Sequence, residues 1–348
     1  MTTRAFGILF LAIWYSQSSP GLELITTIHG NIAPKSVGYS GYGLFFAQNM
    51  MYRHSITVYD RQFRLVKTIS DKVDLAQLGH AGFKGLYRGA PVEVAFSDSG
   101  RYAWVSNYMM FGPGFANSGN DTCSGTGRHD RSFVYCIDAR TFEIVHAVMV
   151  GAVPKYLAAT PDSRLVLVSN WCSYDVSVID AREHQEIRRV KVGRFPRGIV
   201  IDHASEKAYI AVVGSYDIGV LNLSDFSLTW LKGVGRSPRH LVLDPHGNYL
   251  YATLNGEGRV AKVDLVTGKA IRRSPTGVLP RGMAISPDGS YLYVTNYGSN
   301  SLSKLRTEDM TIVEEIPTNE HPIGVAYDPE THRVWVACYT GSIMVFQE

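Results

Sequence analysis

The sequence PRGMAISPDGSYLYVTNYGSNSLS, at residues 280–303, recurs along the chain, and a proline opens each copy. The later copies begin 42 residues apart, and the two earlier intervals are 57 and 63 residues long. The opening prolines are Pro34, Pro91, Pro154, Pro196, Pro238, Pro280 and Pro322. A repeat of this length is typical of propellers and solenoids. We interpret the two longer intervals as insertions of 15 and 21 residues into the same unit.

Each copy contains four short apolar segments that fit β-strands. In the quoted copy and the residues after it, these segments are residues 283–285, 291–295, 301–305 and 312–316, and a Pro-Asp-Gly turn separates the first two. Four strands in a unit of 42 residues predict one propeller blade. We therefore expect an all-β fold, a seven-bladed β-propeller with four antiparallel strands per blade.

The last copy is too short for a complete blade. Residues 322–348 have room for three strands only. An apolar segment at residues 25–29 stands before Pro34 at the same distance at which the fourth strand of one copy stands before the proline of the next. We expect this N-terminal strand to complete the last blade and close the ring, because closure removes the exposed edges of an open sheet. Residues 21–348 would then form a single propeller domain.

The first 20 residues have the pattern of a signal peptide. Arg4 precedes an apolar run at residues 5–15, and small polar residues follow it. Such a run is shorter than the roughly 20 residues of a membrane-spanning helix, but it fits the core of a signal peptide. We expect residues 1–20 to direct export, and the mature protein to be extracytoplasmic, either periplasmic or secreted, without a membrane span. A buried strand is the alternative interpretation.

The composition of the chain and the motifs that it lacks exclude several classes of protein. Hydrophobic residues make up 45% of the chain, which excludes a disordered protein, and a net charge of +3 excludes a globally basic nucleic-acid binder. The sequence contains no Gly-x-Ser-x-Gly nucleophile motif, phosphate-binding loop or Cys-x-x-Cys pair. We therefore assign no catalytic residue, cofactor or metal site from local motifs, and we expect a monomer.

Residues 292–296, Leu-Tyr-Val-Thr-Asn, contain the tetrapeptide that names the YVTN-repeat β-propellers. Val105-Ser-Asn107 and Val168-Ser-Asn170 are related forms. The chain resembles an exported, seven-bladed member of this family over nearly all of its mature length. The resemblance implies the fold but not one function, since relatives include DNA-binding proteins, surface-layer proteins and, more distantly, lactonases and lyases.

The residue that follows the opening proline is basic in five of the seven copies. Because this position lies at the top of each innermost strand, we expect the five side chains to surround the mouth of the central channel. They would attract an anion, such as phosphate, a carboxylate or a nucleic-acid backbone. Local pairing with carboxylates such as Glu93 or Glu320 is the alternative. These residues, here called the basic ring, are Lys35, Lys155, Arg197, Arg239 and Arg281.

Aromatic residues follow the second strand of several copies, on the face that also carries both insertions. Bases or sugars would stack on such rings beside the cations, although packing between blades is the favoured role for each of them taken alone. These residues are Tyr108, Trp171, Tyr297 and Tyr339. Glu93 and His240 occupy the same repeat position near the channel, and they are the best pair for acid–base chemistry. Histidines on this face also offer a weaker hypothesis of a copper or zinc site.

Two of the four cysteines are expected to form a disulfide. Cys123 lies in the long inserted loop of the second blade, and Cys172 lies in the corresponding loop of the third. The two loops are neighbours on one face, and an exported protein meets an oxidising compartment. Cys136 falls within a strand and is expected to be a buried free thiol, although a bond between Cys123 and Cys136 remains an alternative.

The leading functional hypothesis is an exported, non-enzymatic binding protein with a basic channel mouth. Its partner would be an anionic small molecule, a polyanion such as single-stranded DNA, or a protein that docks on the same face. The second hypothesis is a lactone hydrolase or lyase, in which Glu93 or His240 acts as the base and the basic ring holds a carboxylate. The third is a structural surface-repeat protein.

Overall fold

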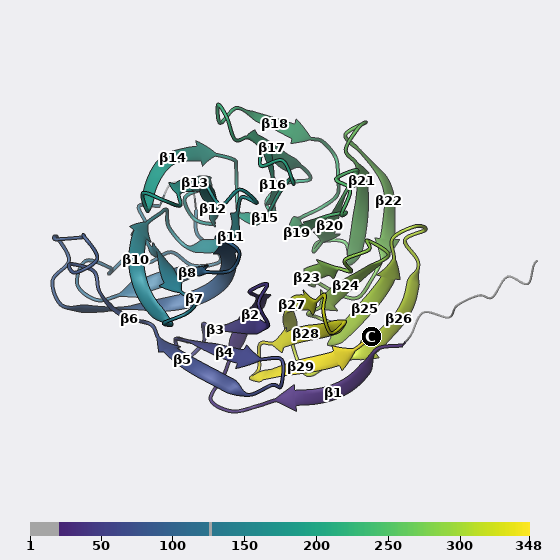
Figure 1. Cartoon of the computed structure of the whole chain (residues 1–348). Coiled ribbons are helices and arrows are strands. Elements are labelled where there is room, and N and C mark those ends of the chain that lie inside the picture. Colours follow the sequence, from purple (N-terminus) through teal and green to yellow (C-terminus); the bar gives the residue numbers. More distant parts are fainter. Residues whose placement is uncertain (1–20, 125–126) are drawn as a thin grey trace, which may run out of the picture.

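The computed structural model describes residues 21–124 and 127–348, and these form seven β-sheets arranged as blades around a central axis (Figure 1). Strands account for all the regular structure in these ranges, as the all-β prediction requires. The described residues contain no helix that is long and apolar enough to cross a membrane. The predicted signal peptide, residues 1–20, lies outside the described part of the chain.

The strands of the first three blades follow chain order, which in blades one and three runs from the innermost to the outermost strand. Blade one contains β2 (Pro34–Tyr39), β3 (Leu44–Asn49), β4 (Ser55–Asp60) and β5 (Leu65–Ser70). Blade two contains β6 (Lys72–Asp74), β7 (Leu86–Ser97), β8 (Tyr102–Phe111), β9 (Phe133–Asp138) and β10 (Glu143–Met149). Blade three contains β11 (Pro154–Ala159), β12 (Leu165–Asn170), β13 (Asp175–Asp180) and β14 (Gln185–Lys191).

The remaining blades have four antiparallel strands each. Blade four contains β15 (Pro196–Ile201), β16 (Lys207–Val212), β17 (Ile218–Asn222) and β18 (Leu228–Leu231). Blade five contains β19 (Pro238–Leu243), β20 (Tyr249–Leu254), β21 (Arg259–Asp264) and β22 (Lys269–Pro275). Blade six contains β23 (Pro280–Ile285), β24 (Tyr291–Asn296), β25 (Ser301–Arg306) and β26 (Ile312–Pro317). Blade seven contains β27 (Pro322–Asp328), β28 (Arg333–Cys338), β29 (Ser342–Gln347) and β1 (Glu23–Ile28).

The N-terminal strand closes the ring as predicted. β1 pairs antiparallel with β29, so that Ile28 lies opposite Ile343 and Glu23 opposite Gln347 (Figure 1). Next to this strand, Leu22 is buried, and its backbone N–H donates to the Glu314 carboxylate of blade six at 2.9 Å.

The two insertions enlarge blade two, and part of the first insertion forms a strand that the repeat pattern does not predict. β6 pairs with the first residues of β7, so that Lys72 lies opposite Arg88, and blade two gains a fifth strand. The guanidinium of Arg88 also bonds to the buried Asp71 carboxylate, Nε to Oδ2 at 2.9 Å. The insertion is therefore anchored to the propeller by backbone pairing and by an ion pair.

Aromatic and aliphatic side chains from neighbouring blades pack together between the sheets. Phe45 of blade one stacks on Trp335 of blade seven, with ring centroids 3.8 Å apart, and both side chains are fully buried. Truncation of such a ring typically costs about 3–5 kcal/mol. The packing places the innermost strands close to one another: a Cβ on Gly198 would lie 2.6 Å from the carbonyl oxygen of Arg239 in the next blade.

The Val-Ser-Asn motifs join one blade to the next. The hydroxyl of Ser106 donates to the carbonyl of Lys155 at 2.8 Å, and that of Ser169 donates to the carbonyl of Arg197 at 2.8 Å. The neighbouring Asn170 donates its side-chain amide to Asp175 and Ser177 within its own blade. The motif therefore fixes the backbone of a basic-ring residue in the following blade.

A strained backbone conformation precedes the opening proline in blades three to seven. A residue before proline normally adopts an extended conformation, but here φ lies between 53° and 61°. The residues are Val153, Phe195, Ser237, Leu279 and His321. Their carbonyls accept hydrogen bonds from the backbone after the second strand; Trp171 N–H, for example, donates to Val153 at 3.0 Å. This geometry positions the aromatic residues relative to the basic residue that follows each proline.

Candidate anion site in the central cavity

Three members of the basic ring, Arg197, Arg239 and Arg281, line a central cavity of about 430 Å³, to which innermost strands of all seven blades contribute. Lys35 and Lys155 are not among the residues that line it. Its lining includes Glu93, Tyr156, Arg197, Arg239, His240 and Arg281. This volume falls in the range of small-molecule sites, which is about 300–1,000 Å³. Lys35, Lys155 and Arg197 are each less than 7% exposed. The charges of the other four cations act on Lys35, so the five cationic residues lie close together and partly out of water.

Two members of the basic ring are paired with carboxylates. Arg197 Nη2 lies 2.7 Å from Glu93 Oε1, as in the local-pairing alternative. Lys155 Nζ lies 2.5 Å from Oδ1 of Asp121, a residue of the long insertion that the sequence analysis did not single out. The Tyr108 hydroxyl donates to the same Asp121 oxygen at 3.1 Å. The insertion thus brings a negative charge to the basic ring.

The other three members have no carboxylate partner within ion-pair distance among residues 21–124 and 127–348. Lys35 and Arg281 instead lie over aromatic rings, at 5.0 Å from the centroid of Tyr339 and 3.6 Å from that of Tyr297. In this part of the chain, Nη1 of Arg197 and Nε of Arg281 are buried without a hydrogen-bond partner. Such donors are costly to bury, so the arrangement favours a ligand that accepts hydrogen bonds.

The protonation equilibria reflect this concentration of charge. Burial and the four other cations lower the pKa of Lys35 well below its usual value. Burial lowers the pKa of Lys155 to about 7, although Asp121 opposes the shift. Burial and the guanidinium groups of Arg281 and Arg197 also lower the pKa of Arg239. A bound anion would stabilise the charged form of all three groups.

The predicted aromatic residues lie beside the basic ring, and two of them, Trp171 and Tyr297, also stack on a residue of the next blade. Lys155 Nζ lies 4.1 Å from the ring centroid of Tyr108 and 5.3 Å from that of Trp171. Trp171 in turn stacks on Phe195 of the next blade, with centroids 4.7 Å apart. Trp171 therefore combines contact with a cation and packing between blades, and 7% of its surface is exposed.

Glu93 and His240 both line the central cavity. Glu93 is engaged by Arg197, and the His240 ring lies edge-on to Tyr156, with centroids 5.1 Å apart. Burial, together with Arg197 and Arg239, lowers the pKa of His240 to about 3. The imidazole is therefore neutral at pH 7. With so low a pKa it is a weak base, whereas efficient general bases titrate near the working pH.

The predicted disulfide between Cys123 and Cys172 is present, with its Cα atoms 5.7 Å apart. Cys136 is a buried free thiol, so the alternative bond to Cys123 is wrong. Cys338 is likewise buried and free. The disulfide holds the inserted loop over blade three, where the Tyr174 hydroxyl also donates to the Cys123 carbonyl at 3.1 Å.

Comparisons with known proteins support the seven-bladed propeller fold. Residues 227–347 match a family model described as lactonase, 7-bladed beta-propeller. A solved structure of hydrazine synthase from Kuenenia stuttgartiensis superposes with a TM-score of 0.73 and 18% identity, over 92% of this chain and 97% of that chain. At this identity the likeness concerns the fold alone. A search of curated proteins finds no match. The finer resemblance to YVTN-repeat proteins stays a prediction.

Proposed function

We propose that this protein is an exported binding protein that holds a small anion with two or more negative charges in the central cavity. The observation that carries the proposal is the charge imbalance of the basic ring. Glu93 and Asp121 are paired with Arg197 and Lys155, whereas Lys35, Arg239 and Arg281 have no carboxylate partner in the described residues. An anion with several carboxylate or phosphate oxygens would compensate these charges and accept hydrogen bonds from the guanidinium groups.

The burial of the ring favours a small ligand over a polymer. Lys35 is 6% exposed and Arg197 is 5% exposed, so neither presents its charge on an open surface. A nucleic-acid backbone is normally bound along an exposed groove that lets successive phosphates reach cations. A compact polycarboxylate or phosphate ester would instead fit a cavity of about 430 Å³.

Export is the second element of the proposal. The sequence pattern of residues 1–20 supports it, and the disulfide between Cys123 and Cys172 is compatible with an oxidising compartment. A ligand that is available outside the cytoplasm is therefore the natural choice for a first screen.

Ligand-induced melting shifts and calorimetric titration with citrate, inorganic phosphate and a short single-stranded oligonucleotide test the binding proposal. We expect saturable binding of a small anion, weaker binding as salt is added, and at least a tenfold loss in an Arg239→Gln/Arg281→Gln variant. The matched control is Arg188→Gln/Arg272→Gln, which removes two exposed arginines from the outer strands β14 and β22. Equal binding by both double variants would show that the basic ring is not the site.

A lactone hydrolase is the second candidate, and the match to the lactonase family model favours it. The matched residues 227–347 include Arg239, His240 and Arg281. In this reaction a base takes a proton from water, the water oxygen attacks the lactone carbonyl, and the ring C–O bond breaks to leave a carboxylate and an alcohol. Glu93 or His240 would act as the base, and the free cations would hold the carboxylate that forms.

Hydrolysis of a lactone that bears a carboxylate, followed by proton release at constant pH, distinguishes the two candidates. A hydrolase would show turnover that falls at least a hundredfold in Glu93→Gln or His240→Gln. Binding of the lactone without turnover would support the non-enzymatic proposal. Because Glu93 is paired with Arg197 and the pKa of His240 is about 3, we expect binding without turnover.

A further inference from the structure

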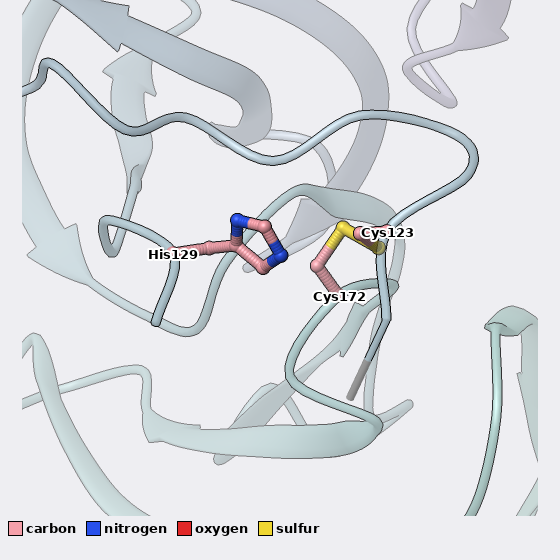
Figure 2. Close-up of side chains that lie close together, drawn as sticks. All are labelled: Cys123, His129 and Cys172. Carbon is pink, nitrogen blue, oxygen red and sulfur yellow. A yellow bond between two sulfur atoms is a disulfide. The ribbon is translucent and has the colours of Figure 1, made fainter. Parts of the chain in front are cut away.

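Within the described residues, one group of three metal-ligating side chains lies with its ligand atoms within 4.8 Å of one another: Cys123, His129 and Cys172. The group lies apart from the cavity lining and comes from two blades. Figure 2 shows the His129 ring beside the two sulfur atoms, which are joined in the disulfide. We propose that, once this disulfide is reduced, the three side chains form a binding site for copper(I).

The imidazole of His129 supplies the second observation. Among the residues that the structure describes, neither Nδ1 nor Nε2 of His129 has a hydrogen-bond partner, although both atoms are buried. A buried imidazole usually bonds through at least one nitrogen, so this ring has a donor and an acceptor to spare. With both nitrogens free, one can ligate a metal without first breaking a protein hydrogen bond.

Hydrogen bonds hold the backbone next to His129 and at Cys172. The Asp130 N–H donates to the Asn117 carbonyl at 3.0 Å, and the Asn117 N–H donates to the Asp130 carboxylate at 2.5 Å. On the other side of the site, the Cys172 N–H donates to the Ala152 carbonyl at 3.1 Å. Between the two segments, the Trp171 indole N–H donates to the Asp121 carbonyl at 3.2 Å, and the Tyr174 hydroxyl donates to the Cys123 carbonyl at 3.1 Å. These bonds keep the inserted loop close to Cys172 when the sulfur–sulfur bond is absent.

The ligand set selects a soft metal. Two thiolates and one imidazole suit copper(I) and zinc among the common metals. Zinc sites are almost always four-coordinate, and only three ligand groups gather here among the described residues. Cys136 and Cys338 do not compete, because both are buried and burial raises the pKa of each thiol to about 12.

The redox step needs a two-electron reductant, such as a dithiol. Thiol–disulfide exchange breaks the Cys123–Cys172 bond, passes two electrons and two protons to the sulfur atoms, and converts the dithiol to its disulfide. Copper(I) then forms two Cu–S bonds and one Cu–N bond with His129. The two thiol protons go to solvent, and the copper is neither oxidised nor reduced.

Titration of copper(I) against a chromophoric copper(I) chelator, under anaerobic conditions and after reduction by a phosphine, tests the site in the full chain. We expect one copper(I) per reduced chain and none bound by the oxidised protein. His129→Gln should weaken binding at least tenfold, and Cys123→Ser/Cys172→Ser should abolish it. His29→Gln, which changes an exposed histidine, should bind as the wild type does. Variants are compared only where their melting curves show a folded protein.

A second measurement needs no variant. In the reduced wild type, bound copper(I) should protect residues 123 and 172 from alkylation, as read by peptide mapping. Unchanged alkylation in the presence of copper(I), or equal affinity for copper(I) in His129→Gln, would overturn the proposal. Stoichiometric binding of zinc without binding of copper(I) would likewise overturn the choice of metal. All of these results are independent of whether the central cavity binds an anion.

Discussion

Removal of the disulfide offers a quantitative test of how the inserted loop is stabilised. The bond joins residues 49 positions apart. In the chain-entropy model, a closed loop of this length restricts the unfolded state by about 4 kcal/mol at 25 °C. The native loop keeps other anchors, since the Trp171 indole N–H donates to the Asp121 carbonyl at 3.2 Å and the Cys172 N–H bonds to Ala152. We therefore expect the loss to arise mainly from the unfolded state.

The variant to make is Cys123→Ala/Cys172→Ala, measured by scanning calorimetry. With an unfolding entropy of about 2.1 cal/mol/K per residue, a loss of about 4 kcal/mol corresponds to a fall in Tm of about 6 °C for a chain of this size. Wild-type protein treated with a phosphine reductant should fall by a similar amount, whereas the variant should not respond to the reductant. A variant that melts within about 1 °C of the oxidised wild type would refute the reasoning.

Two further predictions concern the closing strand and the basic ring. Deletion of residues 1–30 removes β1 and should lower Tm and promote aggregation, because the edge of β29 loses its partner. The control is a chain that lacks only residues 1–20. Equal Tm values for the two chains would contradict ring closure. Anion binding should take up protons near pH 8 and weaken as pH rises, because the ligand raises the pKa of Lys155 from about 7. Calorimetry in buffers of different ionisation enthalpy measures the uptake, which should fall in Lys155→Arg, with the remainder taken up by Lys35. An uptake that is unchanged in this variant would exclude Lys155 as a source.

The pKa of Lys155 also sets the sign of the stability change with pH in the free protein. Above about pH 7 the folded lysine is neutral, while the unfolded lysine stays protonated up to its ordinary pKa of about 10.4. The unfolded state then binds more protons, so the free energy of unfolding contributed by Lys155 rises with pH across this window. Below pH 7 both states are protonated, and the full cost of burying the charge remains.

Features that repeat could be predicted from the sequence, whereas features specific to one loop could not. The opening prolines marked each innermost strand, so Arg197, Arg239 and Arg281 could be placed together without coordinates. The disulfide followed from the same alignment, because Cys123 and Cys172 lie in corresponding loops. Asp121 lies in an insertion without a counterpart in other blades, so no alignment could bring its carboxylate to Lys155.

Local backbone geometry was also beyond the sequence. The positive φ of Val153 contradicts the preference of a residue before proline, and it is maintained by contacts that form only in the folded ring. The pairing of Lys72 with Arg88 in the extra strand likewise depends on how the first insertion folds back on blade two. In both places the three-dimensional environment overrides the local preference.

The union of the first and last strands has a kinetic consequence. Ile28 and Ile343 come from opposite ends of the propeller, so they pair only when the chain between them closes into a ring. The length-dependent entropic cost of closing a loop of this size is about 5 kcal/mol. Until closure, the buried, apolar strand β29 presents an unpaired edge. A second copy that donated its own residues 23–28 to this edge would form the same hydrogen bonds. The pairing of β1 with β29 completes the monomer, and it is therefore also the place at which two folding chains would exchange strands.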